Sequence, residues 1–318
     1  MQTLFAFFSG YFLDPKLLIP IFILGPILIL SSMITWNNRH LWGSEGLFRT
    51  FFHCWAKVSI EFGLILAILG VAIAVIGITT NFRDGSGLFA TLPSALVGTC
   101  TAVICAATGY AFRNSADAVA YRIGKIQWIF FWVITGLAIF QQIDNTGISF
   151  SKTYLQPEFI LIFFPLLCLL TYSGIRAKKS YILSAIEAIF SITMLGIVLG
   201  ISSWFINADD FNASREAIVL TGLVFFWGAW LHLLINTVSL VFPSKTDSEA
   251  ANLGIKTWHY CEAASFFLFL VFAPVGATEY QRESTDQANQ QANNEAQQLE
   301  INQLKAQIEL LTEKVGEV

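Results

Sequence analysis

Long apolar stretches separated by short polar segments fill most of the 318-residue chain. A helix needs about 20 predominantly apolar residues to cross the hydrocarbon core of a bilayer. By that criterion the pattern predicts about eight membrane-spanning helices. The predicted spans are residues 17–36, 58–79, 88–112, 126–142, 157–175, 181–205, 216–242 and 258–277. The expected fold class is an all-α, polytopic transmembrane helix bundle.

Both ends of the chain depart from this pattern. Residues 1–16 hold an aromatic run that is too short to span and stops at Asp14-Pro15, so they are predicted to lie at the membrane interface. Residues 278–318 are polar and carry an apolar stripe at the 3-4 spacing of a coiled coil. The stripe consists of Ile301, Leu304, Ile308, Leu311 and Val315. So short a repeat is not stable alone. The tail is therefore either a frayed, mostly disordered segment or a short coiled coil that joins copies of the chain or binds a partner.

Composition supports the membrane interpretation. Hydrophobic residues make up 55% of the chain and charged residues only 13%, and the net charge is −4. A soluble domain normally has about 25% charged residues. The five cysteines show no metal-ligand spacing. The sequence contains no nucleotide-binding loop, catalytic triad, zinc-protease helix or haem motif. It also contains no cluster of basic residues of the kind that binds nucleic acid. We therefore expect neither an enzyme nor a cofactor or metal, and no cleaved signal peptide.

The distribution of positive charge predicts the orientation. Most of the 18 Lys and Arg residues lie in alternate segments, at 37–57, 113–125, 176–179 and 243–257. Because cytoplasmic loops are enriched in Lys and Arg, these segments are predicted to be cytoplasmic. Both termini then lie outside the cytoplasm, and the expected location is the cell inner (plasma) membrane.

The two halves of the chain resemble each other. Ser59-Ile60-Glu61 opens the second predicted span and Ala185-Ile186-Glu187 opens the sixth, and the two spans end at matching offsets in Asn81 and Asn207. A Gly-x-x-x-Trp motif also opens both the fourth and the eighth span. The pattern predicts a duplication into four-span repeats at 17–142 and 157–277. An even number of spans makes the repeats parallel.

The third predicted span is rich in small and hydroxylated residues. Ser94, Gly98 and Thr101 share one helical face with Cys105, and Thr99 lies about 100° away from Gly98. Small residues permit close helix packing in lipid, and hydroxyl groups can also line a hydrated path. Tight packing and a pore lining are both open interpretations.

Ionisable residues within spans are candidates for function because they are costly in lipid. Glu61 and Glu187 lie near cytoplasmic span ends, where they either reach the interface beside Lys57 or Lys179 or act in transport. His259 and Glu262 share a helical face, as a proton-handling pair or a local ion pair. His232 lies one turn from Asn236, which favours a packing role over a ligand role.

The second and third spans resemble the two-span core of the MotA/TolQ/ExbB proton-channel superfamily. The resemblance rests on ILAILGVAIAVIGI, a short polar loop and LPSALVGTCTAVICAATGYAF, with Leu13-Asp14-Pro15-Lys16 ahead of the first span. It covers about residues 10–115, a third of the chain. It implies a pentameric ring around a pore through which ions drive a partner subunit. The pore threonine of the family corresponds to Thr99, whereas Ser94 stands where ExbB-like proteins carry an acid.

Three functions are compatible with these features. The first is an oligomeric ion-channel or stator-like subunit that conducts protons or sodium and couples the flux to a partner, which is a single-span subunit in the family. The second is a small-solute transporter built from parallel repeats. The third is a non-transporting scaffold or sensor assembled by its coiled coil.

Overall fold

The computed structural model describes residues 15–81, 121–144, 146–206 and 211–242, together with scattered helical positions between 100 and 111 and a few in the tail. Every regular element in these residues is a helix. Five of the helices are long and apolar enough to cross a membrane. The predicted all-α membrane class is therefore confirmed, with the architecture of a multi-pass helical protein.

The described elements follow one another in the order α2 (Pro15–Asn37), η1 (Arg39–Leu41), α3 (Trp42–Glu45), α4 (Leu47–Asn81), α6 (Lys125–Asp144), α7 (Phe150–Thr153), α8 (Pro157–Arg176), α9 (Tyr181–Ile206) and α10 (Phe211–Val241). Six of the eight predicted spans correspond to α2, α4, α6, α8, α9 and α10. Of the predicted span 88–112 the structure describes single helical positions, and the predicted span 258–277 lies outside the described residues.

Two helices begin well before the spans predicted for them. Helix α4 starts at Leu47 instead of residue 58, and α10 starts at Phe211 instead of residue 216. Hydropathy ends a span at the first charged residues, whereas backbone hydrogen bonding continues through them. In α4 the added turns carry Arg49, His53 and Lys57, which recur at i, i+4 and i+8 in line with Glu61.

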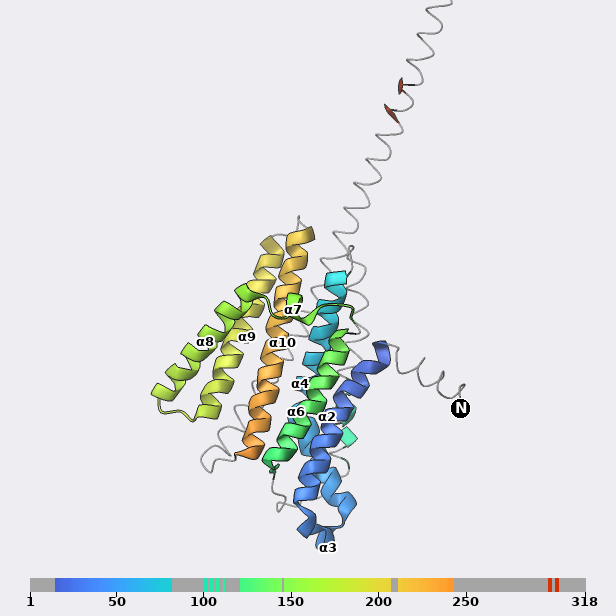
Figure 1. The fold of residues 1–318 in the computed structure, drawn as a ribbon, viewed down its shortest axis with the longest axis vertical. Helices are drawn as coiled ribbons and strands as arrows, with labels where there is room; N and C mark the ends of the chain where they lie inside the picture. The colour runs from blue at the N-terminus through green and yellow to red at the C-terminus, as the bar shows by residue number, and fades with distance from the viewer. Residues whose placement is uncertain are drawn as a thin grey trace, which may run out of the picture.

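Helix α10 is the centre of the described bundle. It packs against α4 on one side and α9 on the other, while α2 packs on α4 and α8 packs on α9. Figure 1 shows α8 at the left edge, followed by α9 and α10, then α4 and α6, which overlap in this view, and α2 to their right. Both α4 and α9 therefore lie between α10 and an outer helix, α2 or α8, while α4 packs on α6 as well.

Glycines bring these helices close together. A Cβ atom added to Gly200 of α9 would overlap the Thr221 hydroxyl of α10. A Cβ on Gly222 of α10 would lie 2.7 Å from Ile76 of α4. Only a residue without a side chain allows this approach, which is the usual basis of helix association in lipid.

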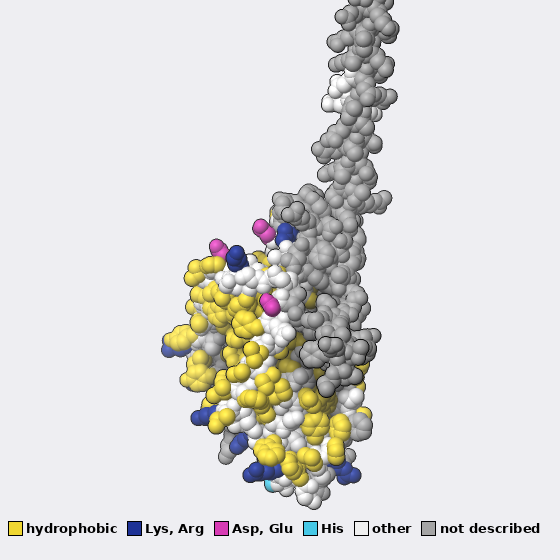
Figure 2. Space-filling model, turned by 45° about the vertical axis from the view of Figure 1, so that its right-hand side comes forward, with side chains coloured by type: hydrophobic (Ala, Val, Ile, Leu, Met, Phe, Trp, Pro, Cys, Tyr) yellow, Lys and Arg dark blue, Asp and Glu magenta, His cyan; other side chains and the backbone are white. Residues whose placement is uncertain are grey.

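The outer surface of the bundle is apolar between two charged ends. Leu161 and Ile162 of α8 are about 70% exposed, as expected of side chains that face lipid. Figure 2 shows this hydrophobic band, with most of the visible Lys and Arg toward its lower end and the visible carboxylates toward its upper end, where further Lys or Arg side chains accompany them. The band has the polarity that a bilayer requires of a spanning protein.

Candidate functional sites

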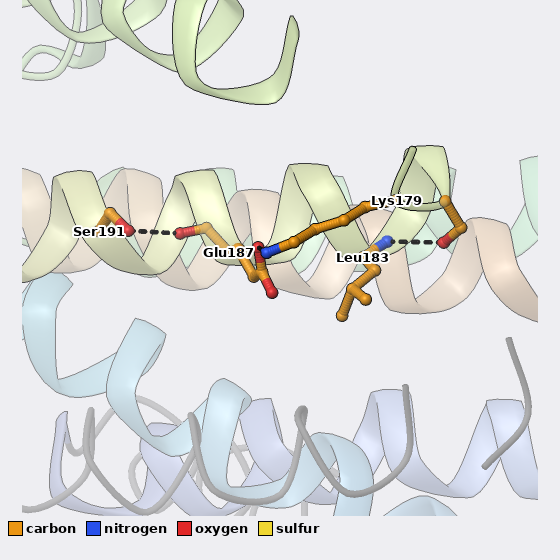
Figure 3. Close-up of polar contacts among 5 residues, drawn as sticks. Lys179, Leu183, Glu187 and Ser191 are labelled. Atoms are coloured by element: carbon orange, nitrogen blue, oxygen red, sulfur yellow. Dashed lines mark hydrogen bonds and ion pairs between the residues drawn. The ribbon is translucent and has the colours of Figure 1, made fainter. Parts of the chain in front are cut away.

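Glu187 is held by an ion pair at the cationic end of the bundle. Its carboxylate lies 2.6 Å from the Lys179 ammonium. Lys178 ends the preceding turn with a φ of +62°, the left-handed conformation that commonly follows a helix. The Ser180 hydroxyl then accepts a bond from the Leu183 amide. This turn directs Lys179 along α9 toward Glu187, as Figure 3 shows.

Glu61 occupies the matching position on α4. Its carboxylate lies 3.8 Å from the Lys57 ammonium. The same ammonium lies 3.5 Å from the ring centre of Tyr121, a cation–π contact. Both predicted intramembrane acids thus have a lysine partner one or two turns nearer the cationic end. These two ion pairs are the contacts expected if each glutamate pairs with a nearby lysine at the membrane interface.

The two glutamates lie at nearly the same level of the bundle. Glu61 is about 22 Å along α4 from Ile76, and Glu187 is about 20 Å along α9 from Gly200, at 1.5 Å per residue. Ile76 and Gly200 in turn contact adjacent residues of α10, namely Gly222 and Thr221. Glu61 and Glu187 therefore flank α10 at similar depth.

His232 lies in the interior of α10 near this level. Its side chain is fully buried. One turn further along, Thr237 is the centre of a polar cluster that the sequence did not predict. Its hydroxyl accepts hydrogen bonds from the indoles of Trp128 and Trp132, at 3.2 and 3.0 Å. The signal was present in the sequence, because the two tryptophans are spaced i, i+4 on the α6 face.

The described positions of the third predicted span have two distinct faces. Cys105 is buried, and its carbonyl accepts a bond from the Trp55 indole at 3.0 Å. Thr101 lies one turn away and is half-buried. The opposite face is exposed along Cys100, Val103, Ile104, Ala107, Thr108 and Ala111. We call these six residues the exposed stripe. Among the predicted pore residues, Ser94, Gly98 and Thr99 lie outside the described residues.

Other predicted sites also fall largely outside the described part of the chain. These are His259 and Glu262, and the coiled-coil residues Leu304, Ile308, Leu311 and Val315. Ile301 is described, and it is helical and half-exposed. Within the described residues, no group of three or more His, Cys, Asp or Glu side chains is placed to hold a metal ion.

A cavity of about 930 Å³ opens at the end of the bundle opposite the two Lys–Glu pairs. Its lining comes from the ends of α4, α7, α8, α9 and α10, and includes Glu158, Arg215 and Glu216. The Arg215 guanidinium donates to the backbone carbonyls of Thr79 and Thr80, so it binds α10 to the end of α4. Sequence reasoning missed this site, although the charged pair Arg215-Glu216 at the start of a span was a visible signal.

Tyr154 lies in the segment that connects α6 to α8, close to this end of the bundle. Its ring is fully buried between Phe150 and Phe226. Burial raises the pKa of the Tyr154 hydroxyl above its ordinary range. That hydroxyl has no hydrogen-bond partner among the residues that the structure describes, whereas the Tyr154 carbonyl accepts a bond from the Trp227 indole at 3.1 Å.

Comparison with protein-family models, with curated proteins and with solved structures finds no match for this chain. What can be concluded about its function therefore comes from the geometry of its own residues.

Proposed function

We propose that this chain is the subunit of a homo-oligomeric membrane complex that conducts protons or sodium, with copies of the chain meeting along the exposed stripe. The observation that carries the proposal is the contrast between a packed and an exposed side among the described helical positions between residues 100 and 111. One face is bound to α4 through Cys105 and Trp55, and the other presents mainly small side chains to the surroundings. Small side chains favour close helix association in lipid.

The proposal includes the finer topology expected from the sequence. Eight spans in two parallel repeats are supported by one shared feature, since α2 packs on α4 as α8 packs on α9, and both α4 and α9 pack on α10. The matching depths of Glu61 and Glu187, which occupy equivalent repeat positions, support the same duplication. The concentration of Lys and Arg at one end of the bundle supports a cytoplasmic location for that end, and thus extracytoplasmic termini.

The intramembrane groups divide into two classes under this proposal. Glu61 and Glu187 are held by lysines, so we assign them a structural role at the cytoplasmic interface. The exposed stripe contributes Cys100 and Thr108 to the junction between copies, and Thr99 retains the pore-lining role that the family resemblance implies. Thr101 lies on the packed side, and we assign it to the contact with α4 instead of the pore.

Ion flux into proteoliposomes tests the proposal. We expect purified wild-type protein to give proton or sodium flux above that of protein-free vesicles. Thr99→Ala and Thr108→Ala should lower this flux several-fold. The control is Thr193→Ala, which changes a buried hydroxyl on α9 that bonds its own helix at Ile189.

Flux that is equal in vesicles with and without protein would contradict ion conduction. Flux that persists unchanged in Thr99→Ala and Thr108→Ala would contradict the roles of these two residues. If no ion flux is found, the small-solute transporter and the coiled-coil scaffold become the better accounts. Deletion of residues 284–318 distinguishes these two, since only the scaffold depends on the tail for assembly.

A further inference from the structure

We propose that the cavity near Arg215 is a binding site for a small organic cation, an amine with an apolar body. This inference goes beyond ion conduction and is independent of it. The cavity, at about 930 Å³, is within the usual size of small-molecule sites, roughly 300–1,000 Å³. It lies among the ends of four long helices, which give it a fixed frame.

The charges on the cavity wall favour a cation. Glu158 and Glu216 both line it. Neither carboxylate has a hydrogen bond or an ion pair in the described part of the chain. Arg215, the other charged residue in the described part of the wall, directs its guanidinium to the carbonyls at the end of α4. A cation at a helix C-terminus offsets the negative end of the helix dipole. The two carboxylates are thus left to bind a ligand ammonium group.

A buried hydroxyl group gives a second, independent indication of a ligand. Thr153 lines the cavity and is only 9% exposed. Its hydroxyl makes no hydrogen bond to any residue within the described ranges. The hydroxyl oxygen is not one of the fully enclosed polar atoms that lack a partner, so it is accessible from the cavity, where it can accept a hydrogen bond from a ligand amine. The neighbouring side chains of Val219 and Leu220 provide the apolar surface for the body of the ligand.

A purely structural role explains these acids only in part. Glu158 lies in the first turn of α8, where a carboxylate stabilises the helix dipole. Glu216 is the sixth residue of α10, beyond the turn where that effect operates. The dipole also gives no account of Thr153 or of the cavity itself. Cation binding accounts for all of these features together.

Four probes that share a phenyl group but differ in charge test the inference. They are 2-phenylethylamine, phenylalanine, 3-phenylpropionate and 2-phenylethanol, added to the full-length protein in nanodiscs. The measurement is the shift in the midpoint of thermal unfolding as each probe is titrated. We expect the amine to bind most tightly, and the anion and the neutral alcohol to give no saturable shift.

Variants then assign the binding to the cavity. Glu158→Gln combined with Glu216→Gln should weaken amine binding about tenfold, since two exposed charge contacts are lost together. Thr153→Val should weaken it by a smaller factor. Asp144→Asn is the matched control, because it removes an exposed carboxylate that does not line the cavity, and it should bind the amine like the wild type.

Three results would overturn the inference. The first is the absence of a saturable shift with the amine, and the second is equal binding of the amine and the alcohol. The third is unchanged amine affinity in the double glutamine variant. None of these depends on ion flux or on the oligomeric state, so the inference and the proposed function can fail separately.

Discussion

Gly200 of α9 and Thr221 of α10 approach so closely that a single added methyl group has no room between them. A methyl carbon at Gly200 would overlap the Thr221 hydroxyl oxygen. Gly196, one turn earlier, approaches Val224 in the same way, since a methyl carbon there would lie 2.6 Å from the valine side chain. The Gly196-x-x-x-Gly200 spacing is the small-x-x-x-small motif of helix pairs in membranes, and here it joins α9 to the central helix.

Gly200→Ala should therefore destabilise the bundle, by about 1–3 kcal/mol, the usual cost of overpacking. Adding Thr221→Ala should recover much of this loss because it removes the clashing hydroxyl. The measurement is the midpoint of thermal or denaturant unfolding in detergent. Gly136→Ala is the control, since nothing lies within 4 Å of the added methyl. Equal effects of the two glycine-to-alanine variants would contradict the close approach.

Thr237 should be sensitive to the loss of its hydroxyl and tolerant of a substitution that keeps it. Thr237→Val leaves the indoles of Trp128 and Trp132 without the acceptor that both use. Each unsatisfied donor costs about 1–3 kcal/mol when buried. Thr237→Ser keeps the hydroxyl and should remain close to wild type. Unfolding midpoints and tryptophan fluorescence report the outcome. Similar behaviour of valine and serine at this position would show that the hydrogen bonds do not contribute.

The buried hydroxyl of Tyr154 should make the free energy of unfolding decrease at alkaline pH. Burial raises the pKa of its hydroxyl, so the unfolded chain ionises at about pH 10, before the folded chain does. Stability is therefore full below about pH 10 and decreases as the pH rises above it, by about 1.4 kcal/mol per pH unit until the pKa of the folded state is reached.

Tyr154→Phe should reduce this alkaline loss by the share that Tyr154 contributes, and should cost little at neutral pH, because the hydroxyl has no partner in the described part of the bundle. Unfolding midpoints measured between pH 8 and about 11 provide the comparison. Tyr181→Phe, which changes an exposed tyrosine of α9, should retain the pH profile of the wild type. An alkaline loss in Tyr154→Phe as large as in the wild type would mean that another group is responsible.

The sequence predicted the helices better than it predicted their contacts. The ends of α8 and α9 agree with the predicted spans to within one residue, because a polar turn with Arg176 and Lys179 interrupts the apolar pattern sharply. The start of α4 was misplaced because a helix continues past the membrane wherever its residues permit. The short helix α7 was not predicted, since four residues are too few to give a periodic signal.

The candidate sites were harder to predict because they depend on which helices are neighbours. The Lys57–Glu61 pair is local to one helix and was visible in the sequence. The cavity instead combines Thr153, Glu158, Ser203 and Arg215 from separate parts of the chain, and hydropathy contains no information about that proximity. The contacts of Thr237 were equally hard to predict, since its hydrogen-bond partners on α6 are more than a hundred residues away in the sequence.

Cysteine cross-linking in native membranes tests most directly whether copies of the chain meet along the exposed stripe. Cys100 is an exposed free thiol on the stripe, and Cys168 is an exposed free thiol on α8. Two variants, each retaining one of these cysteines and no other, are treated with a short bis-maleimide reagent. We predict covalent dimers from the Cys100 variant, the largest product that one thiol per chain allows, and only monomers from the Cys168 variant. A Cys100 variant that remains monomeric, or cross-links no more than the Cys168 variant, would contradict the proposed assembly.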